Sequence, residues 1–204
     1  MGLYQKLLLP RLIDVAMRNK EVAARRALLI PKASGAVLEI GIGSGLNLPF
    51  FPRAITRLAG VDPSAELLSM ARPKLAGVSF PVELFCRSAE DLAFDDRSFD
   101  TAVLTWTLCS IPHPQRAVAE IKRVLKRDGR LLFVEHGLST DPKVQAWQHR
   151  LTPIWRHIGG GCHLNRKIDD LVSLAGFRIV ELQTSYLSGP RPMTFTYQGI
   201  ACPA

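Results

Sequence analysis

The stretch Val37-Leu38-Glu39-Ile40-Gly41-Ile42-Gly43-Ser44-Gly45 decides the fold of this chain, because a short apolar β-forming run leads directly into alternating glycines. A second apolar run ends in Gly60-Val61-Asp62. Its acid follows the first glycine by about 20 residues, the spacing at which a strand–helix–strand unit brings an acid to the glycine turn. Glycine lets the backbone turn sharply and approach a ligand. The acid can accept hydrogen bonds from both ribose hydroxyls, so the sequence predicts a site for an adenosine-containing ligand.

The glycine pattern differs from that of a dinucleotide site, which reads G-x-G-x-x-G and holds a pyrophosphate at a helix N-terminus. Here Gly41, Gly43 and Gly45 alternate, and Glu39 precedes them. A lone glycine turn would also fit an ordinary tight turn or a nicotinamide or flavin site. With Val61-Asp62, however, the pattern E-x-G-x-G-x-G resembles the first two motifs of class I S-adenosylmethionine-dependent methyltransferases.

Two further motifs follow in the order found in that family. Residues 88–94 (SAEDLAF) lead into Ser98-Phe99-Asp100, and residues 121–130 (IKRVLKRDGR) precede the apolar run 131–135. Together the motifs resemble the ubiquinone-biosynthesis-like branch of the family over residues 35–136. This resemblance implies S-adenosyl-L-methionine as the cofactor and S-adenosyl-L-homocysteine as its product.

Strand-like and helix-like runs alternate along the chain, which predicts an α/β fold with a parallel sheet. Strands are expected over 36–40, 57–61, 82–87, 101–105 and 130–135, and helices after Gly45 and over 65–75 and 114–126. The β-rich runs 178–182 and 193–201 should be antiparallel neighbours, because a parallel crossover needs a dozen or more residues. The resemblance thus implies a Rossmann-like class I methyltransferase fold, with a seven-stranded, mostly parallel sheet that ends in an antiparallel hairpin.

A single domain is expected over residues 1–204, since a chain of this length can bury an ordinary core. Its regions would be an N-terminal lid (1–34), a cofactor-binding core (35–136), an acceptor lid (137–175) and a C-terminal β-hairpin (176–204). Neither a signal peptide nor a long apolar run is found, and four cysteines lack paired spacing, which favours a cytoplasmic protein with reduced thiols.

The formal charge of +8 fits an anionic acceptor, an anionic membrane surface or nucleic acid, or simply a solvated surface. Basic residues are spread through the chain, and only 7% of residues are aromatic. No nucleic-acid partner is therefore expected. Peripheral contact with a membrane stays open, because residues 3–26 form a basic, modestly amphipathic stretch.

The family resemblance implies a cofactor site made of Glu39, Gly41, Gly43, Gly45, Asp62, Leu67, Ser88, Ala89, Glu90 and Thr105. Asp62 would bind the ribose hydroxyls, and Leu67 would cover one face of the adenine. Ser88, Ala89 and Glu90 would lie at the adenine edge. Core packing is the alternative for Leu67 and Ala89.

A narrower resemblance begins after residue 105. Its segments are 105–111 (TWTLCSI), Glu135-His136-Gly137, the tryptophan pair within 147–155, and 159–166 (GGGCHLNR). They look like a methyltransferase-like family whose animal members are membrane-anchored thiol S-methyltransferases. The chain departs from it in having no N-terminal hydrophobic anchor, and at Trp106 and Asn165. The resemblance implies an acceptor pocket made of Tyr4, Trp106, Cys109, Trp147, Trp155, His163 and Arg166.

The chemistry asks mainly for alignment and exclusion of water, because the cofactor's sulfonium methyl is already activated. A thiol has a pKa of about 8.5 and needs only a modest shift to ionise. An oxygen or carbon acceptor would need a general base, for which His136 is the candidate; a hydrogen bond to a nearby loop is its alternative role. Cys109, Cys162, His136 and His163 lack the spacing of metal ligands, so no metal is expected.

Three functional hypotheses follow. The first is a methyltransferase for a small, apolar acceptor, with a thiol favoured by the resemblance. The second is a lipid or quinone-precursor methyltransferase at the membrane surface, and the third is a cofactor-binding protein without catalysis. The sequence leaves open the acceptor, the need for a general base and the oligomeric state.

Overall fold

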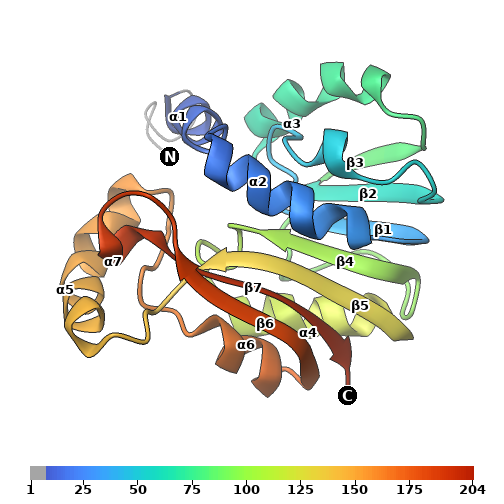
Figure 1. Cartoon of the computed structure of the whole chain (residues 1–204). Helices are drawn as coiled ribbons and strands as arrows, with labels where there is room; N and C mark the ends of the chain where they lie inside the picture. Colours follow the sequence, from blue (N-terminus) through green and yellow to red (C-terminus); the bar gives the residue numbers. More distant parts are fainter. Residues whose placement is uncertain (1–7) are drawn as a thin grey trace.

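One seven-stranded sheet, in the order β3-β2-β1-β4-β5-β7-β6, runs through the computed structural model, which describes residues 8–204 (Figure 1). Neighbours among β1 to β5 are parallel, whereas β7 is antiparallel to both β5 and β6. The predicted mostly parallel sheet with a C-terminal antiparallel hairpin is confirmed. The strands are β1 Ala36–Ile40, β2 Arg57–Asp62, β3 Val82–Cys86, β4 Phe99–Thr105, β5 Leu125–His136, β6 Phe177–Tyr186 and β7 Phe195–Pro203.

Helices cover both faces of this sheet (Figure 1). One core packs α4 and α6 on the sheet, and a second core packs α2 and α3 on the other face. In β1, Leu38 and Ile40 point into the first core and Val37 into the second, so both faces of the strand are apolar, as expected for a central parallel strand. The helices are α1 Leu9–Ala16, α2 Lys20–Leu29, α3 Ala65–Ala71, α4 Pro114–Val124, α5 Pro142–Ile158, α6 Ile168–Leu174 and α7 Arg191–Thr194.

The segment after the glycine turn is not the α-helix that was expected there. It forms only a 3₁₀ turn, Leu48–Phe50, because Pro49 and Pro52 lack a backbone N–H and restrict the residues before them. Similarly, α3 ends at Ala71 and continues as the 3₁₀ helix Arg72–Gly77. The predicted helix 65–75 was therefore too long.

Strand β5 begins earlier than predicted, at Leu125 instead of residue 130. Leu125 pairs with Phe99, and the register then shifts so that Arg130 pairs with Thr101. The additional residues, including Gly129, form an irregularity in the ladder between these two pairs.

The sheet places the functional end of the molecule at the carboxyl ends of β1 and β4. The chain moves outward from β1 to β2 and β3, and then returns to β4 on the other side of β1. In open α/β sheets, ligands bind in the crevice at such a reversal of strand order.

Arg123 explains why two of the sequence motifs occur together. It lies on α4, where its guanidinium donates to the carbonyls of Leu92 (2.7 Å) and Phe94 (2.8 Å) and to the Glu120 carboxylate. Glu120 in turn accepts from the Leu92 N–H at 3.0 Å. The helix motif thus fixes the loop that leads into β4.

Replacing Arg123 with lysine should lower the free energy of unfolding by about 1–3 kcal/mol, because lysine cannot supply the forked donors of a guanidinium. Urea unfolding measures this loss. The matched control is Arg127→Lys, at an exposed arginine shortly after the end of α4. Equal losses in the two variants would contradict the bracing role of Arg123.

Candidate active site

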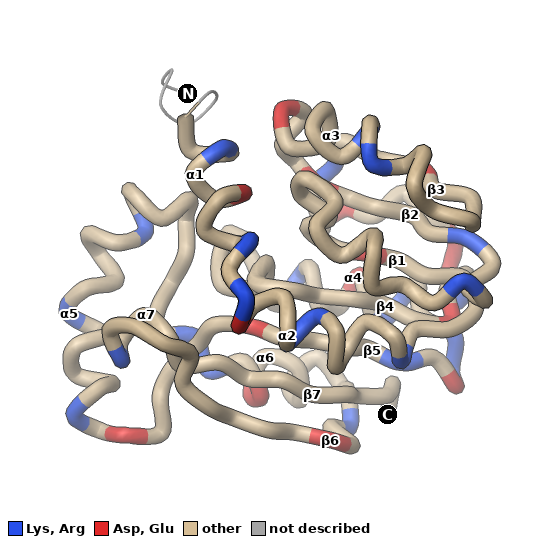
Figure 2. The backbone as a smooth tube through the Cα atoms, turned by 45° about the horizontal axis from the view of Figure 1, so that its top comes forward, with Lys and Arg blue, Asp and Glu red and all other residues tan. Residues whose placement is uncertain are grey.

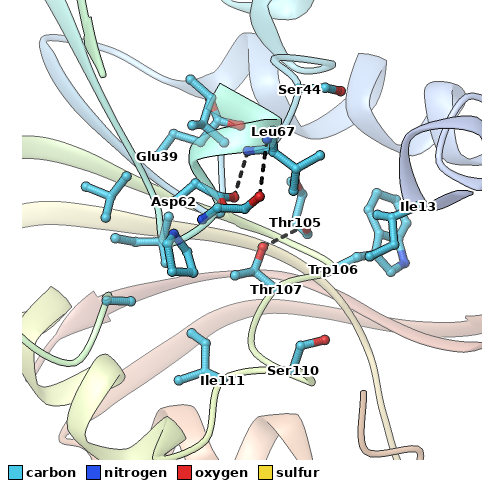
Figure 3. A pocket seen from close by; sticks show the side chains of 18 of the residues that line it. Ile13, Glu39, Ser44, Asp62, Leu67, Thr105, Trp106, Thr107, Ser110 and Ile111 are labelled. Carbon is cyan, nitrogen blue, oxygen red and sulfur yellow. Dashed lines mark hydrogen bonds between the residues drawn. The ribbon is translucent and has the colours of Figure 1, made fainter. Parts of the chain in front are cut away.

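The carboxyl ends of β1, β2 and β4 open into a cavity of about 310 Å³ (Figure 3). Figure 3 shows Asp62 on one side of it and the side chains of Ile13 and Trp106 on the other. Most residues of the predicted cofactor site line the cavity, namely Glu39, Gly41, Gly43, Asp62, Leu67, Ser88, Ala89 and Thr105. Gly45 and Glu90 lie outside the lining; Glu90 accepts a hydrogen bond from the His113 N–H at 3.1 Å.

The glycine turn needs its glycines for two reasons. Gly41 has φ +71° and Gly43 has φ +55°, in the left-handed region where other residues are strained. A Cβ on Gly41 would also overlap the side chain of Thr107. The bare backbone therefore forms one wall of the cavity.

Asp62 ends β2 with its carboxylate fixed in orientation. Oδ2 accepts from the Gly43 N–H at 3.0 Å, and Oδ1 accepts from the Ser64 N–H at 2.8 Å. Burial raises the pKa of Asp62, and these two backbone bonds oppose the rise. Each oxygen keeps a further lone pair with which it can accept a hydrogen bond from a ligand.

Asn47 connects the first strand, the fourth strand and the N-terminal helices. Its Nδ2 donates to Glu39 Oε1 (2.6 Å) and to Thr105 Oγ1 (2.9 Å). Its Oδ1 accepts from Arg26 Nε at 2.7 Å. Arg26 is itself buried, and its Nη1 donates to the Met17 carbonyl at 2.7 Å.

Glu39 has one carboxylate oxygen, Oε2, that is buried and has no partner among the described residues. Burial raises the pKa of Glu39 to about 7, although the Asn47 hydrogen bond and the charge of Arg26 lower it. An acceptor in this position suits a ligand that brings a positive charge or an N–H group.

Helix α1 is attached to the glycine turn by a buried acid. Asp14 Oδ1 accepts from Ser44 Oγ at 2.5 Å, and Asp14 Oδ2 pairs with Arg18 at 2.7 Å. This attachment brings Ile13 and Met17 into the lining of the cavity.

Another part of the lining, beyond the predicted cofactor residues, is largely apolar. It contains Trp106, Ile111, Pro112 and Gly160. Trp106 has φ +52°, a strained value for a bulky residue, and the Arg26 guanidinium lies 5.3 Å from its ring centroid. Strain of this kind is often found where a backbone is shaped for function.

Several predicted pocket residues do not line this cavity. Trp147 lies on the outer side of α5 and is 55% exposed, and Tyr4 falls outside the described residues. The others form a cluster away from the lining, made up of Cys109, Trp155, His163 and Arg166 together with His136. Trp147 and Trp155 both lie on α5, which continues through Pro153, but Trp147 does not face the cavity.

His136 is buried at the end of β5, with Nδ1 at 3.7 Å from Cys162 Sγ. Burial lowers its pKa, which favours the neutral imidazole. A hydrogen bond between Cys109 and Cys162 raises the pKa of the first thiol and lowers that of the second. Arg166 fastens this cluster to the loop after β4 by donating to the carbonyls of Leu108 (2.6 Å) and Ile111 (2.7 Å).

Sequence reasoning missed Asn47, Arg26, Asp14, Ile13 and Thr107 as parts of the site. Asn47 had a local signal, since it is a polar residue in an apolar run just after the glycines. The N-terminal region 1–34 was expected to be a lid, but no pattern singled out Ile13, Asp14 or Arg26, because tertiary packing alone brings α1 and α2 to the turn. Within residues 8–204, no group of three or more His, Cys, Asp or Glu side chains could hold a metal ion.

The raised pKa of Glu39 predicts a specific dependence of stability on pH. Between its usual value near 4.5 and about 7, the unfolded state ionises while the folded state keeps its proton, so stability falls as pH rises. The free energy of unfolding of the wild type should fall by up to about 3 kcal/mol between pH 5 and 8, and Glu39→Gln should abolish this fall. Urea unfolding across this range measures it, with Glu83→Gln, at an exposed strand position, as the control. Parallel profiles for wild type and Glu39→Gln would contradict the assignment.

Comparison with known proteins adds to this geometry. Residues 38–133 match the methyltransferase domain family. Thiol S-methyltransferase TMT1B of Rattus norvegicus is 36% identical over 154 residues, which are 72% of this chain and 62% of that protein. A phosphatidylethanolamine N-methyltransferase of Cereibacter sphaeroides is 37% identical over 114 residues, 55% of this chain and 56% of that protein. The chain thus spans about three fifths of the length of these relatives.

A solved structure, that of a SAM-dependent methyltransferase from Methanosarcina mazei, has the same fold. The TM-score is 0.68 at 24% identity, over 84% of this chain and 93% of that one. The matched domain, the relatives and the shared fold together show that the chain belongs to the class I S-adenosylmethionine-dependent methyltransferases.

Proposed function

We propose that this chain transfers a methyl group from S-adenosylmethionine to a small, apolar acceptor, and that a thiol is the favoured nucleophile. One observation carries the proposal. A single cavity joins the carboxylates of Glu39 and Asp62 to an apolar wall at Trp106. Polar groups for the cofactor and an apolar surface for the acceptor are therefore continuous.

The residues of the cavity fit the cofactor. Asp62 offers acceptors for the two ribose hydroxyls, and the glycine turn leaves room for the methionine part. The unpaired Oε2 of Glu39 suits the cofactor's amino group, directly or through water. Leu67 and Ala89 line the side that would receive the adenine. When bound, the cofactor supplies an activated methyl group on a sulfonium centre.

The chain's own contribution would be alignment and exclusion of water. Helix α1 covers part of the cavity through Ile13, and Asn47 keeps Thr105 and Arg26 in fixed positions beside Trp106. The positive charge of Arg26 next to the acceptor wall would favour an anionic nucleophile.

The preference for a thiol rests on the groups that the cavity lacks. Among residues 8–204, no histidine, cysteine or tyrosine lines it, and its three acids, Asp14, Glu39 and Asp62, are engaged by Ser44, Asn47 and backbone N–H groups respectively. A thiol, with a pKa of about 8.5, ionises with little help, whereas a hydroxyl or a carbon acid needs a base. His136 remains the predicted base for such acceptors, although the structure holds it outside the lining.

The alternative is a lipid or quinone-precursor methyltransferase at a membrane. It is supported by the similarity to a phosphatidylethanolamine N-methyltransferase and by the exposed apolar residues of α1. No helix within residues 8–204 is long and apolar enough to cross a bilayer. On this alternative, the acceptor would be reached from the membrane surface.

Asp62→Asn should weaken binding of S-adenosylhomocysteine at least tenfold, about 1.4 kcal/mol or more, because an amide N–H₂ replaces one acceptor oxygen. Titration calorimetry measures this change. Asp128→Asn, at an exposed acid outside the cavity, should leave the affinity unchanged. An unaltered affinity in Asp62→Asn would refute the ribose assignment.

Formation of S-adenosylhomocysteine should be fastest with small apolar thiols when these are compared with phenols, quinone precursors and phosphatidylethanolamine vesicles. With a thiol, His136→Asn should change kcat less than about threefold, because no strong base is needed. Thermal melting and S-adenosylhomocysteine binding show whether this variant is folded. Turnover confined to lipids or quinone precursors would favour the alternative, and binding without turnover on any acceptor would favour a non-catalytic role.

A further inference from the structure

Helix α1 has the reverse of the usual polarity of a surface helix. Its only acid, Asp14, is 4% exposed and is bonded to Ser44. The outward side instead carries Leu8, Leu12 and Val15, which are 54%, 51% and 68% exposed. Their spacing of four and three residues places them on one face. An ordinary surface helix turns its apolar face to the core and its charges to water.

Helix α5 shows a similar arrangement. Two of its three buried residues, Gln148 and Thr152, are polar, and the third is Val144. Gln148 Nε2 donates to the carbonyls of Gly137 (2.9 Å) and Pro192 (3.1 Å). On the outer side, Trp147 and Ile154 are 55% and 67% exposed. They are one heptad apart and therefore share a face.

The two helices meet at the mouth of the cavity. A Cβ placed on Gly160, just after α5, would lie 3.3 Å from Ile13 Cδ1 and 3.6 Å from Leu9 Cδ2 of α1. Ile13 and Gly160 both line the cavity. In Figure 1, α1 and α5 lie on the same side of the molecule, at the carboxyl edge of the sheet.

The charges around these apolar residues are basic. The segment 142–158 contains no acid, and α5 accordingly carries blue positions but no red ones in Figure 2. Its Lys143, Arg150 and Arg156 are exposed. The Arg150 guanidinium lies 5.8 Å from the ring centroid of Trp147. Arg11 on α1 is exposed, and so is Arg18 just after the helix, whereas the one acid, Asp14, is buried and pairs with Arg18.

We propose that the outer faces of α1 and α5 form a surface that docks on a lipid bilayer containing anionic headgroups. Tryptophan and aliphatic side chains beside arginine and lysine match the interface of such a bilayer, where apolar groups enter the acyl boundary and cations meet lipid phosphates. A protein partner fits less well, because neither helix exposes an acid that could pair across a protein interface, whereas lipid phosphates match a surface whose only charges are cations.

Docking in this way would place the mouth of the cavity at the membrane. An apolar acceptor dissolved in the bilayer could then pass Ile13 and reach Trp106 without crossing bulk water. This consequence rests on the proposed methyl transfer, whereas the docking itself does not.

Flotation with vesicles tests the surface. The full-length protein should bind phosphatidylcholine vesicles that contain phosphatidylglycerol, bind pure phosphatidylcholine less, and be released by salt. Two double variants, Leu12→Ser/Val15→Ser on α1 and Arg150→Gln/Ile154→Ser on α5, should each lower the partition coefficient about tenfold. The matched control is Leu174→Ser, at a leucine of α6 that is 84% exposed.

Calorimetry with S-adenosylhomocysteine separates this proposal from the proposed function. All variants should bind it like the wild type, because none of the changed residues lines the cavity. Flotation that both double variants leave unchanged would overturn the proposal. The proposal would also be overturned if the wild-type protein did not bind anionic vesicles but formed a dimer that these variants dissociate. A second copy of the chain would then cover the surface.

Discussion

The side-chain amide of Asn47 is the contact on which the arrangement of the site depends. Both of its N–H groups and its oxygen are used, and the partners lie on β1, on β4 and on α2. Because buried polar groups need hydrogen-bond partners, the three residues fix the Asn47 amide, and the amide in turn fixes their positions relative to one another. The contact thereby fixes the entry into the 3₁₀ turn, the orientation of Glu39 and the position of Arg26 over Trp106.

The electrostatic character of the cavity follows from burial. Loss of hydration on burial is the main reason that the pKa values of Glu39 and Asp62 are both raised. The charge of Asp62 raises the pKa of Glu39 further. Backbone N–H groups compensate Asp62, whereas Glu39 retains an unpaired oxygen. The cavity is therefore best matched by a ligand that presents hydroxyls to one acid and a cation to the other. S-adenosylmethionine has both features.

The sequence predicted what local patterns can encode. The glycines, Asp62 and the apolar runs gave the sheet and one side of the cavity, because strand ends and turn residues follow from short-range rules. The helix expected after Gly45 was wrong, since Pro49 and Pro52 allow only a 3₁₀ turn. The family resemblance put Trp147 and Trp155 in the acceptor pocket but could not show which way the faces of their helix point. Arg26 and Asp14 enter the site through tertiary packing, which no local pattern reveals.

The left-handed backbone at Trp106 lowers the stability of the fold at a position where the side chain contributes to the cavity. A bulky residue with φ +52° costs about 1–3 kcal/mol, a cost that glycine would not carry. Glycine would, however, remove the ring that lines the apolar wall of the cavity and lies beneath Arg26. Selection for thermal stability alone would therefore tend to erase this tryptophan, and a tryptophan kept there would be a sign that the wall is in use.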